Sequence, residues 1–406
     1  MTSHSKQFIG VASNVLLANY RSAPLVFVEG KGCRLKDADG KSYLDLVAGI
    51  AVVSVGHAHP ELARAIGEQA GRLMHVSNLF FNDRGIELAQ QLTERTPFTR
   101  FFFCNSGAEA NETLLKLARR YHWNRGDKQR TKIITAFNSF HGRTMGALSM
   151  TGQTKYQEGM APMVPDIEHV PYGDLAALER AVDARTAGVI LEPVQGEGGV
   201  VAGTPEYLRG ARELCDRAGA LFLLDEVQTG YGRTGRFLAA EWSGVVPDAC
   251  ALAKGIAGGF PLGAVGVTDR VKEALPPGSH GTTYGGNALA CAAGLAVLRI
   301  FDAEQLVRNA ETVGEHLGRR IEMLVADPEA PAAAAARGIG LLRGIAIAEA
   351  YDPAPIVADL RQRGVLVSLA GGSVLRLSPP LCITAAEVDE AMTAITAAVR
   401  AAHPRT

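Results

Sequence analysis

Short runs of apolar residues alternate along the chain with stretches in which apolar residues recur at helical spacing. The runs that are long enough for buried strands lie at 100–104, 132–136, 187–191, 220–224, 249–253 and 262–267. Between them, the residues after 107 and the residues 204–218 have the periodicity of amphipathic helices. Strands that alternate with helices are typical of βα units, so the pattern predicts an α/β fold with a mainly parallel central sheet.

The pattern changes near both ends of the chain. Residues 30–46 contain closely spaced Gly and Asp turn residues, which predict a small antiparallel meander. Residues 326–337 are rich in Ala and Pro, so we expect a loop or linker there. The strand-like segments 339–347, 366–368 and 374–377 then alternate with helices, as in a smaller α+β domain. The expected parts are an N-terminal segment, 1–50, that contributes to the small domain, a large α/β domain, 51–295, and the small C-terminal α+β domain, 296–406.

Composition narrows the class of protein. The 406 residues include 41 Lys and Arg against 42 Asp and Glu, so nothing in the charge favours nucleic acid or an anionic membrane as a partner. The six cysteines form no C-x-x-C pair, which is typical of reduced, buried thiols. No stretch has the pattern of a signal peptide or a membrane span. We therefore expect a cytoplasmic enzyme, and 45 glycines point to close approach between backbone and ligand.

Two side chains follow buried runs in the middle of the chain. Asp225 comes directly after an apolar run, at the strand end where open α/β sheets bind ligands, although such an acid can also cap the following turn. Lys254 lies in the least polar window of the chain, 250–267. Most lysines are solvated surface groups. A desolvated lysine amine has a lowered pKa and becomes a nucleophile for carbonyl groups, the chemistry of a Schiff base.

Two further motifs lie at expected strand-to-helix turns. The segment 106–110 has small residues that leave backbone N–H groups free for a phosphate, although Ser106 with Glu109 would also make an ordinary helix cap. In the segment 140–144, Phe140 can stack on an aromatic ring and Arg143 can bind a carboxylate, or they are a core Phe and a surface Arg. A nucleophilic lysine, an acid, a phosphate site and a stacking ring are together what pyridoxal phosphate requires.

At this point the chain closely resembles the class III aminotransferases of fold type I. The likeness covers nearly the whole chain and rests on the segments SGAEA (106–110), FHGRT (140–144), EPVQGEGG (192–199), LLDEVQTGYGRTG (223–235), AKGIAGGFPLGA (253–264), HGTTYGGNALACAA (280–293) and LRLSPPL (375–381). The resemblance implies a fold-type-I architecture, with pyridoxal 5'-phosphate bound by the large domain and a smaller α+β C-terminal domain. It implies no metal.

The resemblance also assigns cofactor roles. Lys254 would hold the cofactor covalently and move the proton, and Asp225 would keep the ring nitrogen protonated. The ring would lie between Val227 and Phe140. The partner subunit's Thr283 would reach the phosphate, which implies a homodimer with a shared active site. The full implied cofactor set is Gly107 and Ala108 at the phosphate, Gln228 at the ring hydroxyl, Phe140, Asp225, Glu226, Val227, Lys254 and Thr283.

Two arginines would serve two substrates. In relatives that use glutamate and 2-oxoglutarate, the arginine matching Arg376 binds the α-carboxylate. The arginine matching Arg143 binds the distal carboxylate, or the α-carboxylate of an ω-amino substrate. Glu197 looks like the acid that pairs with Arg376 and masks it while the ω-amine is bound. Thr282 and Tyr20 are the remaining residues expected to contact substrate.

Within the family, the segments 48–60 and 76–82 resemble acetylornithine aminotransferases of arginine biosynthesis. Ornithine aminotransferases tend to have a tyrosine where Ile50 falls, and Ile50 is compatible with an acylated amine. The implied reaction moves the δ-amino group of N2-acetyl-L-ornithine to 2-oxoglutarate, giving N-acetylglutamate 5-semialdehyde and glutamate. Ser54 stands where relatives often have Asn, which leaves succinylornithine and N-succinyldiaminopimelate as alternative substrates.

Other classes remain as alternatives. His57 and His59 form an H-x-H after an apolar run, a metal-ligand pattern of barrel hydrolases. The residues that could complete such a site are His141, His169, Lys254 and Asp225. That reading leaves the glycine-rich lysine segment unexplained, and Pro60 favours a plain turn before a helix. A non-catalytic regulator that binds pyridoxal phosphate would need a DNA-binding extension. An aminomutase of the same class would not form glutamate from 2-oxoglutarate.

Overall fold

The computed structural model describes residues 3–405, and its centre is a seven-stranded sheet. The strand order is β4-β12-β11-β10-β7-β5-β6. β12 is antiparallel to both of its neighbours, and the other pairings are parallel. The bounds are β4 Arg100–Cys104, β5 Lys132–Ala136, β6 Ile167–Val170, β7 Thr186–Leu191, β10 Leu221–Asp225, β11 Ala249–Leu252 and β12 Gly263–Val267. The predicted α/β fold with a mainly parallel sheet is confirmed.

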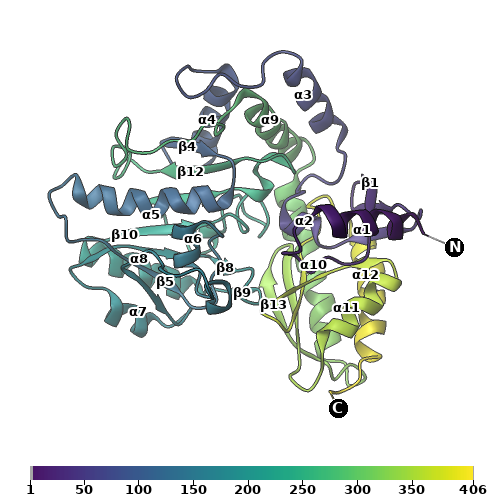
Figure 1. Cartoon of the computed structure of the whole chain (residues 1–406). Helices are drawn as coiled ribbons and strands as arrows, with labels where there is room; N and C mark the ends of the chain where they lie inside the picture. The colour runs from purple at the N-terminus through teal and green to yellow at the C-terminus, as the bar shows by residue number, and fades with distance from the viewer. Residues whose placement is uncertain (1–2, 406) are drawn as a thin grey trace.

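Helices cover both faces of this sheet (Figure 1). The side chains of β10 alternate between the two faces of the sheet, because successive residues of a strand point to opposite faces. Leu221 and Leu223 belong to one buried cluster with residues of α5 (Gly107–Trp123). Phe222 and Leu224 belong to another with residues of α8 (Pro205–Ala218). Since β10 is buried on both faces, its five residues are all apolar except the last, Asp225.

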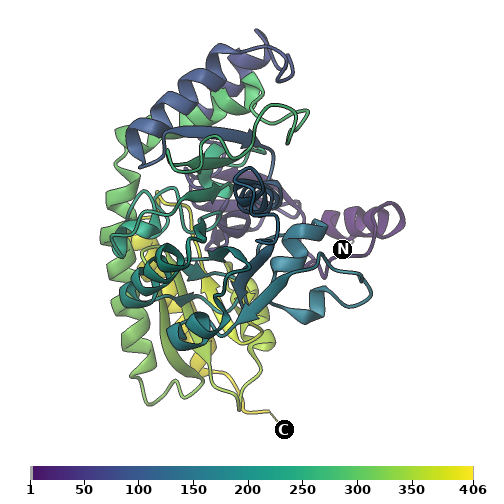
Figure 2. The same cartoon turned by 90° about the vertical axis from the view of Figure 1, so that its left-hand side faces the viewer.

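A second group of helices packs beside the sheet. α3 (Pro60–Ala70) and α4 (Asp83–Arg95) lie against α9 (Ala288–Ala303), and α10 (Leu306–Val325) follows α9 along one side of the molecule (Figure 2). Side-chain caps begin several of these helices, including Asn82 at α4 and Asn287 at α9. Pro60 occupies the first turn of α3, as predicted. Between residues 3 and 405, no helix is both long and apolar enough to cross a membrane.

The C-terminal part contains a sheet of its own, in the order β13-β14-β17-β16. A further sheet, β1-β2-β3-β15, joins the two ends of the chain, since Leu44 pairs with Val365. This pairing supports the expected contribution of the N-terminal segment to the small domain. The expected boundary after residue 295 falls inside α9, so one helix continues across it, and the three-part division stays a prediction.

The remaining elements are short or belong to these two sheets. The strands are β1 Phe27–Lys31, β2 Arg34–Asp37, β3 Ser42–Asp45, β8 Val194–Gln195, β9 Val201–Ala202, β13 Ala333–Ile339, β14 Leu342–Ile347, β15 Val365–Leu366, β16 Ser368–Ala370 and β17 Val374–Leu377. The α-helices are α1 His4–Val15, α2 Ala48–Ala51, α6 Met145–Met150, α7 Leu175–Ala181, α11 Pro353–Gln362 and α12 Ala385–Arg400. The 3-10 helices are η1 Thr154–Tyr156, η2 Ala239–Trp242 and η3 Lys254–Ala257.

One prediction from the pattern was wrong. The Ala-rich segment 326–337 was expected to be a loop, but its second half enters β13, which pairs antiparallel with β14. Alanine has low strand propensity, so the partner strand decides this conformation. The expected strand at 339–347 is likewise interrupted by a turn at Gly340, whose φ of +57° favours glycine.

Candidate active site

A cavity of about 470 Å³ opens at the carboxyl ends of the parallel strands. Residues that follow β4, β5, β7, β10 and β11 all contribute to it, because parallel strands end at the same edge of a sheet. Of the site residues expected from the sequence, it gathers Gly107, Ala108, Phe140, Arg143, Glu197, Asp225, Val227, Gln228 and Lys254.

Lys254 lies one residue beyond the end of β11, at the first position of η3. Its φ is +45°, a left-handed conformation that costs a non-glycine residue energy and that recurs at functional sites. Burial lowers the pKa of the Lys254 amine to about 8, although the nearby Glu197 and Asp225 act in the opposite direction. The neutral, nucleophilic fraction of this amine near physiological pH is therefore a minority, but it is far larger than that of an ordinary lysine.

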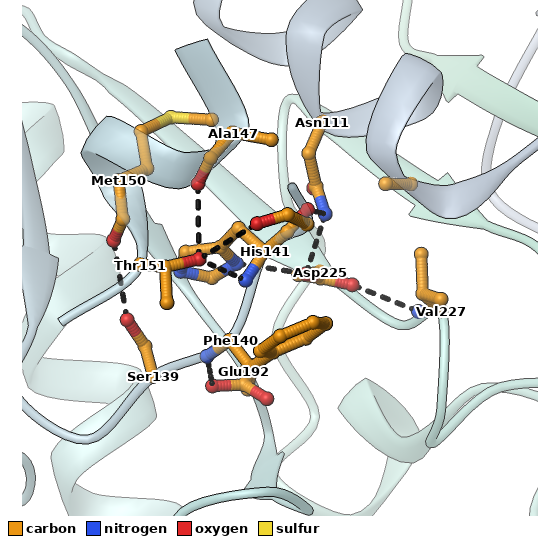
Figure 3. Close-up of polar contacts among 12 residues, drawn as sticks. Asn111, Ser139, Phe140, His141, Ala147, Met150, Thr151, Glu192, Asp225 and Val227 are labelled. Carbon is orange, nitrogen blue, oxygen red and sulfur yellow. Dashed lines mark hydrogen bonds and ion pairs between the residues drawn. The ribbon is translucent and has the colours of Figure 1, made fainter. Parts of the chain in front are cut away.

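Asp225, the last residue of β10, is held by three donors (Figure 3). Its Oδ2 accepts a hydrogen bond from Asn111 Nδ2 at 2.7 Å and lies 2.7 Å from His141 Nδ1. Its Oδ1 accepts from the Val227 N–H at 2.9 Å, so the turn-capping alternative is realised as well. The carboxylate is buried, and these bonds fix its orientation toward the cavity.

Asn111 and His141 were missed as partners of Asp225. Asn111 is one helical turn after Gly107 on α5, so the helix aims both residues at the cavity. His141 Nε2 lies 2.9 Å from Thr135 Oγ1, so the ring is bonded on both sides. A neutral ring can donate from Nδ1 to Asp225 while Nε2 accepts from the Thr135 hydroxyl. The signal for His141 was its place inside the 140–144 motif.

Glu192, directly after β7, is a second buried acid in the cavity that the sequence reasoning left without a role. Its Oε2 accepts a hydrogen bond from the Phe140 N–H at 3.2 Å. Burial, together with the negative Asp225, raises the pKa of Glu192 well above its usual range. The raised pKa favours the neutral form of the Glu192 carboxyl.

The N-terminus of α5 forms another wall. Ser106 accepts a hydrogen bond from the Glu109 N–H at 3.2 Å, and this is the helix cap that the sequence suggested as the plain alternative. The Gly107 and Ala108 N–H groups precede the first intrahelical bond and are free to bind an anion. A Cβ on Gly107 would lie 2.6 Å from Val227 Cγ1, so only glycine allows α5 to approach Val227 this closely.

Gln228 presents a buried amide with unsatisfied polar atoms. Within residues 3–405, neither Nε2 nor Oε1 has a hydrogen-bond partner. Such groups are rare in proteins because desolvation without a partner costs about 1–3 kcal/mol. A Cβ on Gly196 would lie 1.5 Å from this oxygen, so the glycine makes room for the amide. An unpartnered buried amide beside an open cavity indicates that a polar ligand completes its hydrogen bonds.

These features fit pyridoxal phosphate. The N–H groups of Gly107 and Ala108 suit its phosphate, the Gln228 amide its ring hydroxyl, and the Asp225 carboxylate its ring nitrogen. Lys254 offers an amine to its aldehyde. Phe140 and Val227 line the same cavity.

Arg376 on β17 is paired with Glu197 by a short ion pair. The arginine is 2% exposed, and its guanidinium also donates to Ser368 Oγ at 3.1 Å and to the Gly196 carbonyl at 3.3 Å. Burial alone would raise the pKa of Glu197, but the Arg376 guanidinium and the Lys254 amine outweigh it, and that pKa lies below its usual value. Arg376 reaches the site through Glu197, which lines the cavity.

Arg143 differs in its surroundings. Its exposed guanidinium lies 3.8 Å from the ring centre of Tyr156 and 5.6 Å from that of Phe140. Within residues 3–405, no carboxylate pairs with it. Cation–π contact holds a guanidinium in place without neutralising its charge, so Arg143 remains available to an anion. Tyr156, in η1, was not anticipated from the sequence.

Several expected residues lie outside the cavity. Glu226 points away from it, because its carboxylate accepts hydrogen bonds from the Ala239 and Ala240 N–H groups at 2.7 and 2.8 Å. Thr282 accepts a hydrogen bond from Asn105, a residue of the cavity wall, without lining the cavity itself. Thr283 is exposed and does not line the cavity. Tyr20 is 81% exposed and does not line the cavity.

The H-x-H pattern does not form part of this site. His57 Nε2 lies 2.7 Å from Asp45 Oδ2, and His59 Nε2 lies 2.8 Å from Glu304 Oε1. Both histidines are therefore bound to separate acids outside the cavity. Over the described part of the chain, no group of three or more His, Cys, Asp or Glu side chains is arranged to hold a metal ion.

Comparison with known proteins agrees with this geometry. The family model "Aminotransferase class-III" matches residues 16–399, and the chain belongs to that family. It is 45% identical to an acetylornithine aminotransferase of Caldanaerobacter subterraneus over 93% of this chain and 95% of the relative. The ornithine aminotransferase structure from Toxoplasma gondii ME49 superposes with a TM-score of 0.94 at 35% identity, covering 97% of this chain and 94% of that one. The acetylornithine aminotransferase of Elizabethkingia anophelis gives 0.87 at 33% identity, covering 97% and 98%.

Proposed function

We propose that this class III aminotransferase binds pyridoxal 5'-phosphate in the cavity and transfers the δ-amino group of N2-acetyl-L-ornithine to 2-oxoglutarate. The products are N-acetylglutamate 5-semialdehyde and glutamate, as in arginine biosynthesis. The observation that carries the choice of substrates is the contrast between two arginines: Glu197 covers Arg376, while Arg143 has no acid partner among residues 3–405.

The cofactor, when bound, supplies an aldehyde that accepts the amino group and a ring that withdraws electrons from the neighbouring carbon. The residues of the chain do the rest. Lys254 would hold the cofactor through its amine and would carry a proton to and from the substrate carbon. Asp225, oriented by Asn111 and His141, places a negative charge where the ring nitrogen is protonated.

Two carboxylate sites explain how one cavity accepts two unlike substrates. Arg143 binds the α-carboxylate of the acylated ornithine, which leaves the δ-amine to reach Lys254. In this half-reaction Glu197 keeps Arg376 neutralised, so the arginine does not attract that carboxylate. In the second half-reaction Glu197 releases Arg376, which binds the α-carboxylate of 2-oxoglutarate while Arg143 binds the distal one.

The active unit proposed is a cytoplasmic homodimer. Thr283 lies in an exposed segment next to Tyr284, which is 64% exposed, and the segment borders Asn105 of the cavity wall through Thr282. Asn78 donates a hydrogen bond to the Thr282 carbonyl at 3.1 Å, and the residues that follow it, Leu79, Phe80 and Phe81, are 85%, 70% and 94% exposed. An apolar surface beside an incomplete site is what a partner subunit would cover. The partner subunit's Thr283 would then complete the phosphate site.

The substrate is tested by comparing kcat/KM for N-acetylornithine, N-succinylornithine, N-succinyldiaminopimelate, ornithine and 4-aminobutyrate, each with 2-oxoglutarate. The largest value is expected for N-acetylornithine. A matched variant, Ile50→Tyr, should raise the ratio of ornithine to N-acetylornithine efficiency, because the tyrosine hydroxyl favours a free α-amine. A native preference for ornithine or 4-aminobutyrate would overturn the proposal, and a preference for a succinyl substrate would replace the acetyl assignment.

A further inference from the structure

Two cysteines that are far apart in the sequence meet between the N-terminal and C-terminal parts. Cys33 lies in the turn between β1 and β2, and Cys382 lies between β17 and α12. Their Sγ atoms are 3.8 Å apart. The remaining cysteines, Cys104, Cys215, Cys250 and Cys291, are buried, and within residues 3–405 none of them contacts another cysteine sulfur.

The backbone around the pair is firmly anchored. The Cys33 carbonyl accepts a hydrogen bond from the Asp45 N–H at 2.8 Å, and the Leu381 N–H donates to the Ser54 carbonyl at 2.8 Å. A Cβ on Gly56 would lie 2.9 Å from Cys382 Sγ, so the glycine leaves room for the sulfur. These contacts hold the two sulfurs as neighbours at 3.8 Å, and a disulfide requires them to approach to the bonding distance of about 2.05 Å.

The two thiols differ in burial and in acidity. Cys33 is 4% exposed, whereas Cys382 is partly exposed. The hydrogen bond from Cys33 lowers the pKa of the Cys382 thiol, and the same bond together with burial raises that of Cys33. Cys382 is therefore the thiol that reacts first, since the thiolate is the nucleophile, and Cys33 is placed to react second.

A buried cation adjoins the pair. Arg233 is 2% exposed, it acts electrostatically on both sulfurs, and its guanidinium donates to the Leu341 and Pro379 carbonyls. Its Nη2 has no hydrogen-bond partner within residues 3–405. A cation favours the thiolate, while the acids Glu304, Glu387 and Asp45 oppose it.

We propose that Cys33 and Cys382 form a reversible disulfide when the enzyme meets a small disulfide oxidant such as glutathione disulfide. The Cys382 thiolate attacks one sulfur of the oxidant, forming a mixed disulfide and releasing one glutathione thiolate. The Cys33 thiol then gives up its proton, attacks Cys382 Sγ and releases the second glutathione. The protein pair loses two electrons and two protons, and the oxidant gains them as two thiols.

The disulfide would tie together parts of the chain that come from opposite ends of the sequence. The β1-β2-β3 strands already contact the C-terminal part through β15 and through the ion pair between Arg34 on β2 and Glu390 on α12. A covalent link between residues 33 and 382 closes a long loop, which restricts the unfolded chain far more than the folded one. Oxidised protein is therefore expected to unfold at a higher temperature than reduced protein.

The test uses the holoenzyme in glutathione redox buffers of increasing oxidised fraction. After alkylation and digestion, mass spectrometry should find a peptide linking residues 33 and 382, and the thiols counted after unfolding should fall from six to four. Dithiothreitol should restore all of them. Cys33→Ala and Cys382→Ala should each abolish the linked peptide and the rise in unfolding temperature, while the matched control Cys215→Ala should keep both.

Three outcomes would overturn the proposal. The first is the absence of the linked peptide in oxidised native protein. The second is Cys382 remaining as a mixed disulfide with glutathione although Cys33 is present. The third is a link that forms only after urea unfolding, because the native geometry would then have no part in it.

Discussion

The two halves of the cavity are built differently. The wall formed by Asp225, Lys254 and the start of α5 has its groups fixed by short connections to the central sheet and by hydrogen bonds that do not depend on a substrate. The other wall consists of the long charged side chains of Glu197 and Arg143, with Arg376 paired to Glu197 behind the cavity surface. In the proposed cycle these charged groups exchange partners. We infer that the residues for the chemistry, Asp225 and Lys254, form a fixed centre. The charged residues for substrate recognition form an adjustable wall, as a cycle with two substrates requires.

The largest effect is expected at the fixed centre. Lys254→Ala removes both the amine that binds the aldehyde and the group that moves the proton, so kcat should fall by about 10⁴-fold or more. Circular dichroism and sedimentation should match the wild type. A variant that is folded and retains near wild-type turnover would contradict the assigned role.

The second-largest loss of activity is expected for substitution of Asp225. Asp225→Asn keeps the size and hydrogen-bonding ability of the side chain but removes the negative charge, and kcat should fall by about 10²–10³-fold. The companion variant Asn111→Ala keeps the charge and loosens only its orientation, so a loss of about 10-fold is expected. If the two losses were equal, orientation and not charge would be the main contribution of Asp225.

Substitutions in the adjustable wall should affect the two half-reactions unequally. Arg376→Ala should slow the glutamate half-reaction by about 10²-fold and leave the N-acetylornithine half-reaction within a few fold, because Arg376 is masked in the latter. Glu197→Gln should mainly impair the acylornithine half-reaction by leaving Arg376 uncovered. Single-turnover absorbance changes measure the two half-reactions separately, and equal losses in both would break the proposed contrast.

The pH dependence tests the depressed pKa of Lys254 directly. Since burial lowers this pKa to about 8, the neutral amine is scarce at pH 6 and predominates above pH 8. The rate at which cofactor-free protein takes up pyridoxal phosphate should rise with pH, with a midpoint near 8 instead of the ordinary lysine value of about 10.4. Stopped-flow absorbance measures it, with Lys254→Arg as the control. A midpoint near 10 would exclude a desolvated amine.

The smallest effect is expected at Tyr156. Tyr156→Leu removes the ring beneath Arg143 while leaving the guanidinium itself, so KM for N-acetylornithine should rise by a few fold at nearly constant kcat. Tyr156→Phe keeps the ring and should restore the wild-type KM. A fall in kcat without a change in KM would assign Tyr156 to the fixed centre instead.

The strand-end positions were the predictable part of the site. Asp225 and Lys254 follow apolar runs. Because parallel strands end at the same edge of a sheet, residues that follow such strands lie near that edge. Their partners were not predictable in the same way. Asn111 is a polar residue on a helix, and its neighbours in the sequence do not distinguish it from a polar residue exposed to solvent. Only the packing of α5 against β10 brings its Nδ2 to 2.7 Å from Asp225 Oδ2. Glu226 is the opposite case: it is next to Asp225 in the sequence, but its side chain points away from the cavity. Its carboxylate accepts hydrogen bonds from the Ala239 and Ala240 N–H groups, which the sequence does not indicate.

By itself the sequence determined the α/β class and the residues at the carboxyl edge, because hydrophobic periodicity and local turn chemistry act over a few residues. It determined the family through the likeness of motifs such as FHGRT (140–144) to those of class III aminotransferases. The tertiary structure decided which distant groups meet: His141 on Asp225, Tyr156 beneath Arg143, Cys33 against Cys382, and the alanine-rich strand β13 against β14. The physical reason is that these contacts depend on how whole elements pack. One side chain cannot specify that packing, and every buried face contributes to it.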